Sequence, residues 1–186
     1  NNIGAELGRE MSLRMPLVDF FSLKSNLSKN IIDASPMLWK LRIIKSNSEI
    51  DKINHICKIT SDAYENLPLL IKEGDSERDI SRKLRIDLIS RGADSIPFLP
   101  IVSGEGGVSQ IICEPTNRGL KNGDILFIDT GSTYDGYFCD FDRNYSIGKV
   151  SDIVNDVYEI LWIATQSAID LAKPGITLSD LWQIMV

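Results

Sequence analysis

The segment from Gly123 to Arg143 most constrains the fold, because it has the pattern of a β-hairpin. Residues 124–129 are an apolar run of the kind found in strands buried on both faces. Asp135-Gly136 is a preferred two-residue hairpin turn, and an aromatic-rich second run follows it. We therefore expect two antiparallel strands joined by a tight turn.

This hairpin would bring acidic side chains together. With a turn at Asp135-Gly136, Asp129 faces Asp142 across the ladder, and Asp140 is the diagonal neighbour on the same face. Like charges at this separation are destabilising unless a cation lies between them. Aspartates also solvate turns very commonly. From spacing alone, a divalent-cation site and a pair of turn-capping residues are equally good interpretations.

Periodicity elsewhere predicts an α+β fold, with helices on one side of a mostly antiparallel sheet. Helical patterns begin near Pro16, Ser35, Ser48, Ser76, Ser151 and Thr177. Pro68 should kink or end the third of these helices. Short extended runs are expected at 3–6, 30–33, 97–102, 109–113, 124–129 and 133–147. The sequence contains no evident internal repeat.

Composition excludes several classes of protein. The net charge of −6 disfavours nucleic acid as a partner, since phosphate binding needs a basic face. No apolar run reaches the roughly 18 residues of a membrane helix, so no membrane contact is expected. The three cysteines form no CxxC pair, which favours reduced thiols in a cytoplasmic protein. Alternation places Cys139 on the face opposite Asp140.

The chain has one histidine, His55, which lies off the apolar stripe of its helix. A solvent-facing residue is the favoured interpretation, and a Ser-His-Asp or Cys-His catalytic arrangement is disfavoured. Ser103 to Gly107 is glycine-rich but contains Glu105 and lacks the lysine of a phosphate loop. We interpret it as a flexible turn.

Several motifs together resemble one family. These are Asp129-Thr130-Gly131, Tyr134, Gly136-Tyr137, Asp140, Arg143 and Gly148, with Leu41-Arg42, Lys45-Ser46, Glu49-Ile50, Gly74, Glu77 and Ile80 upstream. They resemble the pita-bread metallopeptidases, in particular the branch of aminopeptidase P, prolidase and creatinase. The resemblance implies that Asp129 and Asp140 bind metal, with Asp140 bridging two ions (Mn, Co or Zn).

The resemblance also implies a domain organisation. Residues 1–38 resemble the end of the N-terminal domain of that branch, and residues 39–186 the N-terminal half of the pita-bread catalytic domain. We expect a fragment, since the chain begins without methionine and stops inside an amphipathic segment. Half of such a domain exposes a strand edge and an apolar face, which favours a homodimer.

Three departures from the family pattern bear on activity. The family binds metal with a further His and two Glu from the second half of the domain. The 186 residues of this sequence do not supply these three ligands. Ile112 occupies the position where the family usually has a His near the reacting centre. Asp142 replaces a common Thr, and either adds a ligand or, as the favoured interpretation, pairs with Arg143 or solvent.

Two functions remain open at this stage. The first is part of a dinuclear-metal Xaa-Pro peptidase that acts on peptides or small amides. In that case these residues alone are inactive and bind metal weakly or not at all, so the chain has no catalytic residue of its own. The second is a non-catalytic pita-bread module that binds other proteins. Retention of Asp129 and Asp140 favours the first, and Ile112 mildly favours the second.

Overall fold

The computed structural model describes residues 2–9 and 11–186. The chain divides into two compact units, Asn1–Asp51 and Lys52–Val186. Among the described residues, no helix combines the length and the apolar character needed to span a membrane.

The first unit contains two short strands and two helices. They are β1 (Ile3–Ala5), α1 (Leu17–Asn26), β2 (Ile31–Asp33) and α2 (Ser35–Ile43). The two strands pair in parallel. Asp33 accepts a hydrogen bond of 2.9 Å from the backbone amide of Ser35, where α2 begins. The extended segments and helices expected in this region are present.

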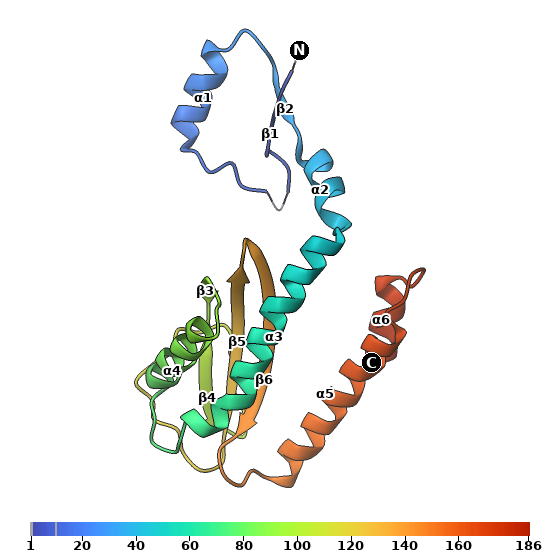
Figure 1. The fold of residues 1–186 in the computed structure, drawn as a ribbon. Helices are drawn as coiled ribbons and strands as arrows, with labels where there is room; N and C mark the ends of the chain where they lie inside the picture. Colours follow the sequence, from blue (N-terminus) through green and yellow to red (C-terminus); the bar gives the residue numbers. More distant parts are fainter. Residues whose placement is uncertain (1, 10) are drawn as a thin grey trace. The chain divides into compact units, whose positions relative to one another are not determined.

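The second unit is an antiparallel sheet with helices. Its elements are α3 (Asn47–Leu70, beginning in the first unit), α4 (Glu77–Ser90), β3 (Ser95–Phe98), β4 (Ile101–Glu105), β5 (Asp124–Tyr134), β6 (Tyr137–Ser146), α5 (Asp152–Leu171) and α6 (Leu178–Met185). β5 is central: β6 pairs along one side of it, and β3 and β4 share the other (Figure 1). The expected fold class, α+β with a mostly antiparallel sheet, is confirmed.

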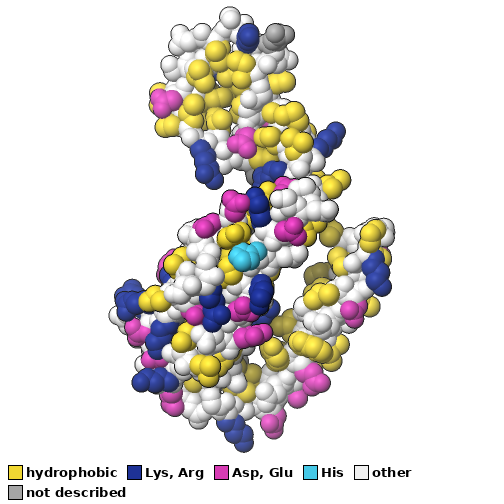
Figure 2. Space-filling model, in the orientation of Figure 1, with side chains coloured by type: hydrophobic (Ala, Val, Ile, Leu, Met, Phe, Trp, Pro, Cys, Tyr) yellow, Lys and Arg dark blue, Asp and Glu magenta, His cyan; other side chains and the backbone are white. Residues whose placement is uncertain are grey.

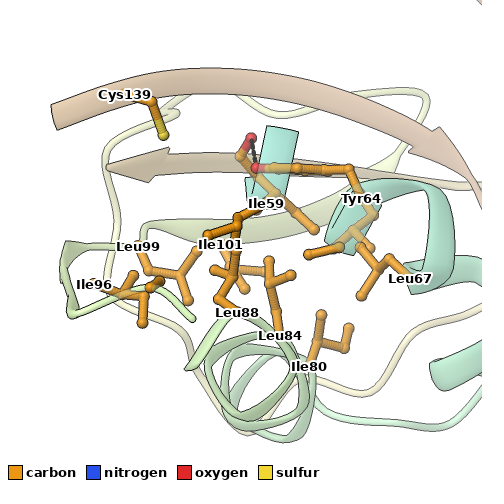
Figure 3. Packing of buried hydrophobic residues seen from close by; sticks show 14 of the residues in the cluster. Ile59, Tyr64, Leu67, Ile80, Leu84, Leu88, Ile96, Leu99, Ile101 and Cys139 are labelled. Atoms are coloured by element: carbon orange, nitrogen blue, oxygen red, sulfur yellow. Dashed lines mark hydrogen bonds between the residues drawn. The ribbon is translucent and has the colours of Figure 1, made fainter. Parts of the chain in front are cut away.

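The core lies between one face of this sheet and the helices α3 and α4 (Figure 3). Its largest side chains that are completely or almost completely buried are Ile56, Leu67, Ile80, Leu84, Leu88, Ile101, Leu120, Leu126 and Ile128. Tyr64 of α3 reaches the strands, where its hydroxyl shares a hydrogen bond of 2.7 Å with Thr130. Burial raises the pKa of Tyr64 well above its usual range, so this hydroxyl stays protonated.

Three expectations about local structure were wrong. β5 is buried on one face only, because its residues alternate between buried and half-buried. The run at 97–102 is divided between β3 and β4, and residues 109–113 form no strand. Pro68, expected to kink or end the helix, lies inside α3, two residues before its end at Leu70. α5 and α6 have the same local plan as α3 and α4: a helix, a glycine turn and a second helix with a capping box.

The helices α5 and α6 pack against each other, but neither contains a buried residue. Their hydrophobic side chains gather along the surface of this helix pair (Figure 2), including Ile153, Val157, Ile160, Trp162, Leu178 and Trp182. An open groove of about 650 Å³ lies between α5 and the end of β6, lined by residues such as Tyr145, Ile153 and Tyr158. The predicted apolar stripe of α5 is therefore present but uncovered.

Candidate metal centre

The turn between β5 and β6 fixes the positions of the acidic side chains. Asp135 and Gly136 have φ values of 47° and 80°. Positive φ at both central residues is the mark of a type I′ turn, whose twist matches that of the flanking strands. The amide of Asp135 donates a hydrogen bond of 2.6 Å to the carboxylate of Asp94. The two-residue turn expected from the sequence is confirmed.

The strand register places three carboxylates on one face of the sheet. Asp129 is paired with Asp142, and Gly131 with Asp140. The amide of Asp129 donates to the carbonyl of Pro100 at 3.1 Å, on the side away from β6. Asp129 and Asp142 therefore form a non-hydrogen-bonded pair, in which Cα atoms lie about 4.5 Å apart. The expected juxtaposition is confirmed, and it lies on the face opposite α3 and α4.

The electrostatics of this cluster are unfavourable in the absence of a cation. Burial, followed by the charges of Asp142 and Asp140, raises the pKa of Asp129 to about 6. Burial and the charge of Asp140 also raise the pKa of Asp142. Among the described residues, no lysine, arginine or histidine forms an ion pair with any of the three. The three carboxylates are therefore not held by an ion pair within the described chain, although the charge of Arg143 partly offsets the rise in the pKa of Asp142.

The cluster supplies only part of a donor set for a divalent cation. Asp129 Oδ1 is buried and has no hydrogen-bond partner among the described residues. Carboxylate oxygens are the ligands that Mn²⁺, Mg²⁺ and Ca²⁺ prefer. The His, Cys, Asp and Glu residues of the described chain form no group of three or more that would hold a metal ion. Asp129 and Asp140 are thus a partial donor set.

An aromatic ring borders the carboxylates. A Cβ atom at Gly131 would overlap the ring of Phe138, so a larger residue there would displace this ring from its place over the strand. Phe138 lies on the same face as Asp140, by alternation along β6, and remains about half exposed. The sequence contained a signal for this feature, since Gly131 interrupts β5 and glycine inside a strand often marks a close approach.

A second polar network, which sequence reasoning missed, anchors the segment before β5. Glu77 is 2% exposed. Its Oε1 accepts hydrogen bonds from the amide and hydroxyl of Ser103, and its Oε2 from those of Thr116, at 2.7 to 2.9 Å. Arg118 forms a bidentate ion pair with Asp124 and also donates to Ser103 Oγ. The network ties the N-terminus of α4 to β4, β5 and residues 116–118.

Burial alone would raise the pKa of Glu77. The hydrogen bonds from Thr116 and Ser103 outweigh burial and hold its pKa below the usual value of 4.5. No local pattern predicts this role, because an acidic residue in the first turn of a helix is ordinary. The partners of Glu77 come from residues 26 and 39 positions away.

The other residues considered from the sequence lie away from the carboxylates or on the opposite face. His55 is exposed, as expected, with its ring centroid 4.4 Å from that of Tyr134. Cys139 is buried on the helix side, as expected, with Sγ 3.2 Å from the hydroxyl of Thr60. Ile112 is 69% exposed in the irregular segment after β4.

The fold and the sequence together define a metallopeptidase-type domain. Residues 51–186 match the model of metallopeptidase family M24, and the chain belongs to this family. It is 30% identical over 175 residues to an Xaa-Pro dipeptidase of Pyrococcus furiosus, covering 94% of this chain and 50% of the relative.

Solved structures agree with this assignment. The prolidase of Pyrococcus horikoshii has a TM-score of 0.84 at 28% identity, covering 94% of this chain and 50% of that one. An X-Pro aminopeptidase of Thermotoga maritima has a TM-score of 0.81 at 27% identity, covering 92% and 49%. The chain thus spans about half the length of these relatives, and its fold is that of half of a pita-bread proline peptidase.

Proposed function

We propose that residues 39–186 are the N-terminal half of the catalytic domain of a dinuclear-metal Xaa-Pro peptidase, and that residues 1–38 are the end of a preceding domain. The observation that carries this proposal is the β5–β6 register, which brings Asp129 and Asp140 to one face in a chain of family M24. The names of the relatives support a peptide substrate with proline after the scissile bond. We also propose a cytoplasmic location.

In this proposal, Asp129 and Asp140 hold two divalent ions, for which Mn, Co and Zn are the candidates. Bound ions of this kind polarise the scissile carbonyl and lower the pKa of water. Asp140 lies nearer the open side of the face, since its side chain is exposed while Asp129 is partly covered. The exposed ring of Phe138 provides an apolar surface beside them.

These 186 residues alone should not hydrolyse peptides. Two aspartates cannot fix two divalent ions in a reactive geometry, because an incomplete ligand set binds too weakly. The test is hydrolysis of Xaa-Pro dipeptides by the purified chain with added Mn²⁺. We expect rates equal to those of buffer. A metal-dependent rate that disappears in Asp129→Asn would contradict the half-site proposal.

The positive arm of the test supplies the other half. The 186 residues replace the corresponding residues of the Pyrococcus horikoshii prolidase, which they match in fold over 94% of their length. Metal-dependent release of proline by this chimera is the expected result, with Asp129→Asn and Asp140→Asn as inactive controls. A soluble, folded chimera that binds Mn²⁺ but gives no turnover would favour the second candidate function.

That second candidate is a non-catalytic module that binds other proteins. It is favoured by Ile112, a residue without proton-transfer chemistry, and by the uncovered apolar surface of α5 and α6. The same surface supports our proposal that the chain forms a homodimer, because exposed apolar patches of this extent are usually covered. Light scattering at micromolar concentration should give twice the mass of the chain. A monomeric mass would contradict the homodimer.

A further inference from the structure

We propose that Asp142 is a third carboxylate ligand for a divalent cation, acting with Asp129 and Asp140. The inference rests on the proposed function, since it concerns the same face of the β5–β6 hairpin. It assigns to this chain an all-oxygen donor set for a hard cation such as Mn²⁺, and gives Asp142 a role beyond that of a solvated strand residue.

The strand register places Asp142 closer to Asp129 than Asp140 is. Asp142 is the direct partner of Asp129, whereas Asp140 faces Gly131 and is diagonal to Asp129. Cβ atoms of directly opposite residues lie about 4.5–5.5 Å apart, and those in non-hydrogen-bonded pairs are the closer ones. Two carboxylates on such positions can place one oxygen each at about 2.0–2.6 Å from a shared ion.

The neighbouring arginine forms no ion pair with Asp142. Arg143 Nη1 donates to the backbone carbonyl of Asp142 at 2.6 Å, and the guanidinium carbon lies 5.0 Å from the ring centre of Phe141. Alternation places Phe141 and Arg143 on the helix side of the sheet, opposite the Asp142 carboxylate. Of the two arrangements favoured from the sequence, the pairing of Asp142 with Arg143 is not found, whereas exposure of Asp142 to solvent is.

A carboxylate oxygen of Asp129, the residue opposite Asp142, also lacks a hydrogen-bond partner. Asp129 Oδ1 is shielded from solvent and accepts no hydrogen bond from the described residues. An unpaired carboxylate oxygen in such a place is destabilising. A cation held between Asp129 and Asp142 would satisfy this oxygen and remove the repulsion between the two charges at once.

Convergence on one ion requires the side chains to rotate. Among the described residues, the carboxylates do not form a group of three that would hold a metal ion as they stand. An aspartate has two side-chain torsions, and the strand pairing already fixes the Cβ positions. Because water must complete the coordination, we expect an affinity near the weak end of protein sites, on the order of 10⁻⁴–10⁻³ M.

The test is Mn²⁺ binding to the 186-residue chain, with free Mn²⁺ measured by electron paramagnetic resonance. Asp142→Asn should weaken binding about tenfold or more, since affinity follows the number of charged ligands. Asp170→Asn, an exposed substitution on α5 with the same change of charge, is the control and should leave binding unchanged. Asp129→Asn should abolish Mn²⁺ binding.

Thermal melting is the second readout, and it separates a ligand from a merely structural residue. Without metal, Asp142→Asn should melt higher than the wild type because a like charge has been removed. With Mn²⁺, the wild type should gain melting temperature and Asp142→Asn should gain little. A variant that loses stability in both conditions would contradict the inference.

The remaining outcomes distinguish the inference from the proposed function. Wild-type binding by Asp142→Asn, together with loss of binding in Asp129→Asn and Asp140→Asn, would overturn the role of Asp142 and leave the proposed function intact. No Mn²⁺ binding by the wild type up to about 10 mM, well beyond the weakest protein sites, would overturn the three-carboxylate site alone. Binding that survives Asp129→Asn would contradict both.

Discussion

The helix pairs α3–α4 and α5–α6 share their local plan but differ in burial. Gly74 and Gly175 each have a positive φ and lie two residues before the N-cap of the second helix. Those caps, Ser76 and Thr177, both form complete capping boxes with an aspartate three residues later. Local sequence therefore specifies the same helix–turn–helix twice.

The difference lies in what covers the apolar faces. Ile59 and Ile160 stand at the same distance before the two turn glycines, yet Ile59 is 5% exposed and Ile160 is 68% exposed. The residue after each cap differs too, since Glu77 is buried and Leu178 is 85% exposed. Local sequence signals are thus sufficient to form a helix. How much that helix contributes to the stability of the fold depends on whether it packs against a sheet.

The comparison predicts the largest effect for core truncation. Ile59→Ala should reduce the free energy of unfolding by about 2–5 kcal/mol, because it leaves a cavity between α3 and the sheet. The matched Ile160→Ala should change it by less than about 0.5 kcal/mol, as exposed substitutions usually do. Urea unfolding followed by circular dichroism measures both. Equal losses would mean that α5 is covered in solution.

A smaller loss is expected from the buried carboxylate. Glu77→Gln should reduce the free energy of unfolding by roughly 2–3 kcal/mol, since an amide nitrogen cannot accept the hydrogen bonds now donated to one carboxylate oxygen. Leu178→Gln at the matching position of α6 serves as the control and should be nearly neutral. The same urea titration applies, and a neutral Glu77→Gln would show that the network can rearrange.

Removal of the two caps should have a smaller and unequal effect. Ser76→Ala should lower global stability by about 1 kcal/mol, because α4 is part of the core. Thr177→Ala removes an identical cap but should leave global stability almost unchanged and instead increase fraying of α6. Amide hydrogen exchange resolved along the chain tests this, and faster exchange in the core of Thr177→Ala would contradict it.

The smallest expected effect is on acid stability. The folded-state pKa of Glu77 lies below its usual value of 4.5. Its contribution to stability is therefore fully present above that value and is lost as the pH falls through the folded-state pKa. Urea midpoints between about pH 3 and 6 should fall less steeply with acid in Glu77→Gln than in the wild type. Parallel curves would exclude Glu77 as a source of acid sensitivity.

The sequence predicted elements whose signals are local. The helix start at Ser76 and the Asp135-Gly136 turn follow from residues a few positions apart, and the face shared by Asp129 and Asp142 follows from that turn. Each depends on backbone geometry that neighbouring residues determine directly.

Features that depend on distant residues were not predictable. The four hydrogen bonds to Glu77 come from β4 and the segment before β5, which no periodicity connects to α4. An exposed apolar face was expected, but its location on α5 was not, because the apolar stripe of α5 is as regular as that of α3. Sequence patterns identify a face suited to burial, and only the tertiary structure decides whether a partner is present.

The tight β5–β6 turn also has a kinetic consequence. Closing a two-residue loop loses little chain entropy, and hairpins form in about 1–10 μs, whereas β4 reaches β5 only after the long irregular segment between them has closed. We therefore expect the three aspartates to meet early in folding, before the helices pack, so that their repulsion opposes nucleation of the sheet. Dissolved salt that screens these charges should accelerate refolding of this chain.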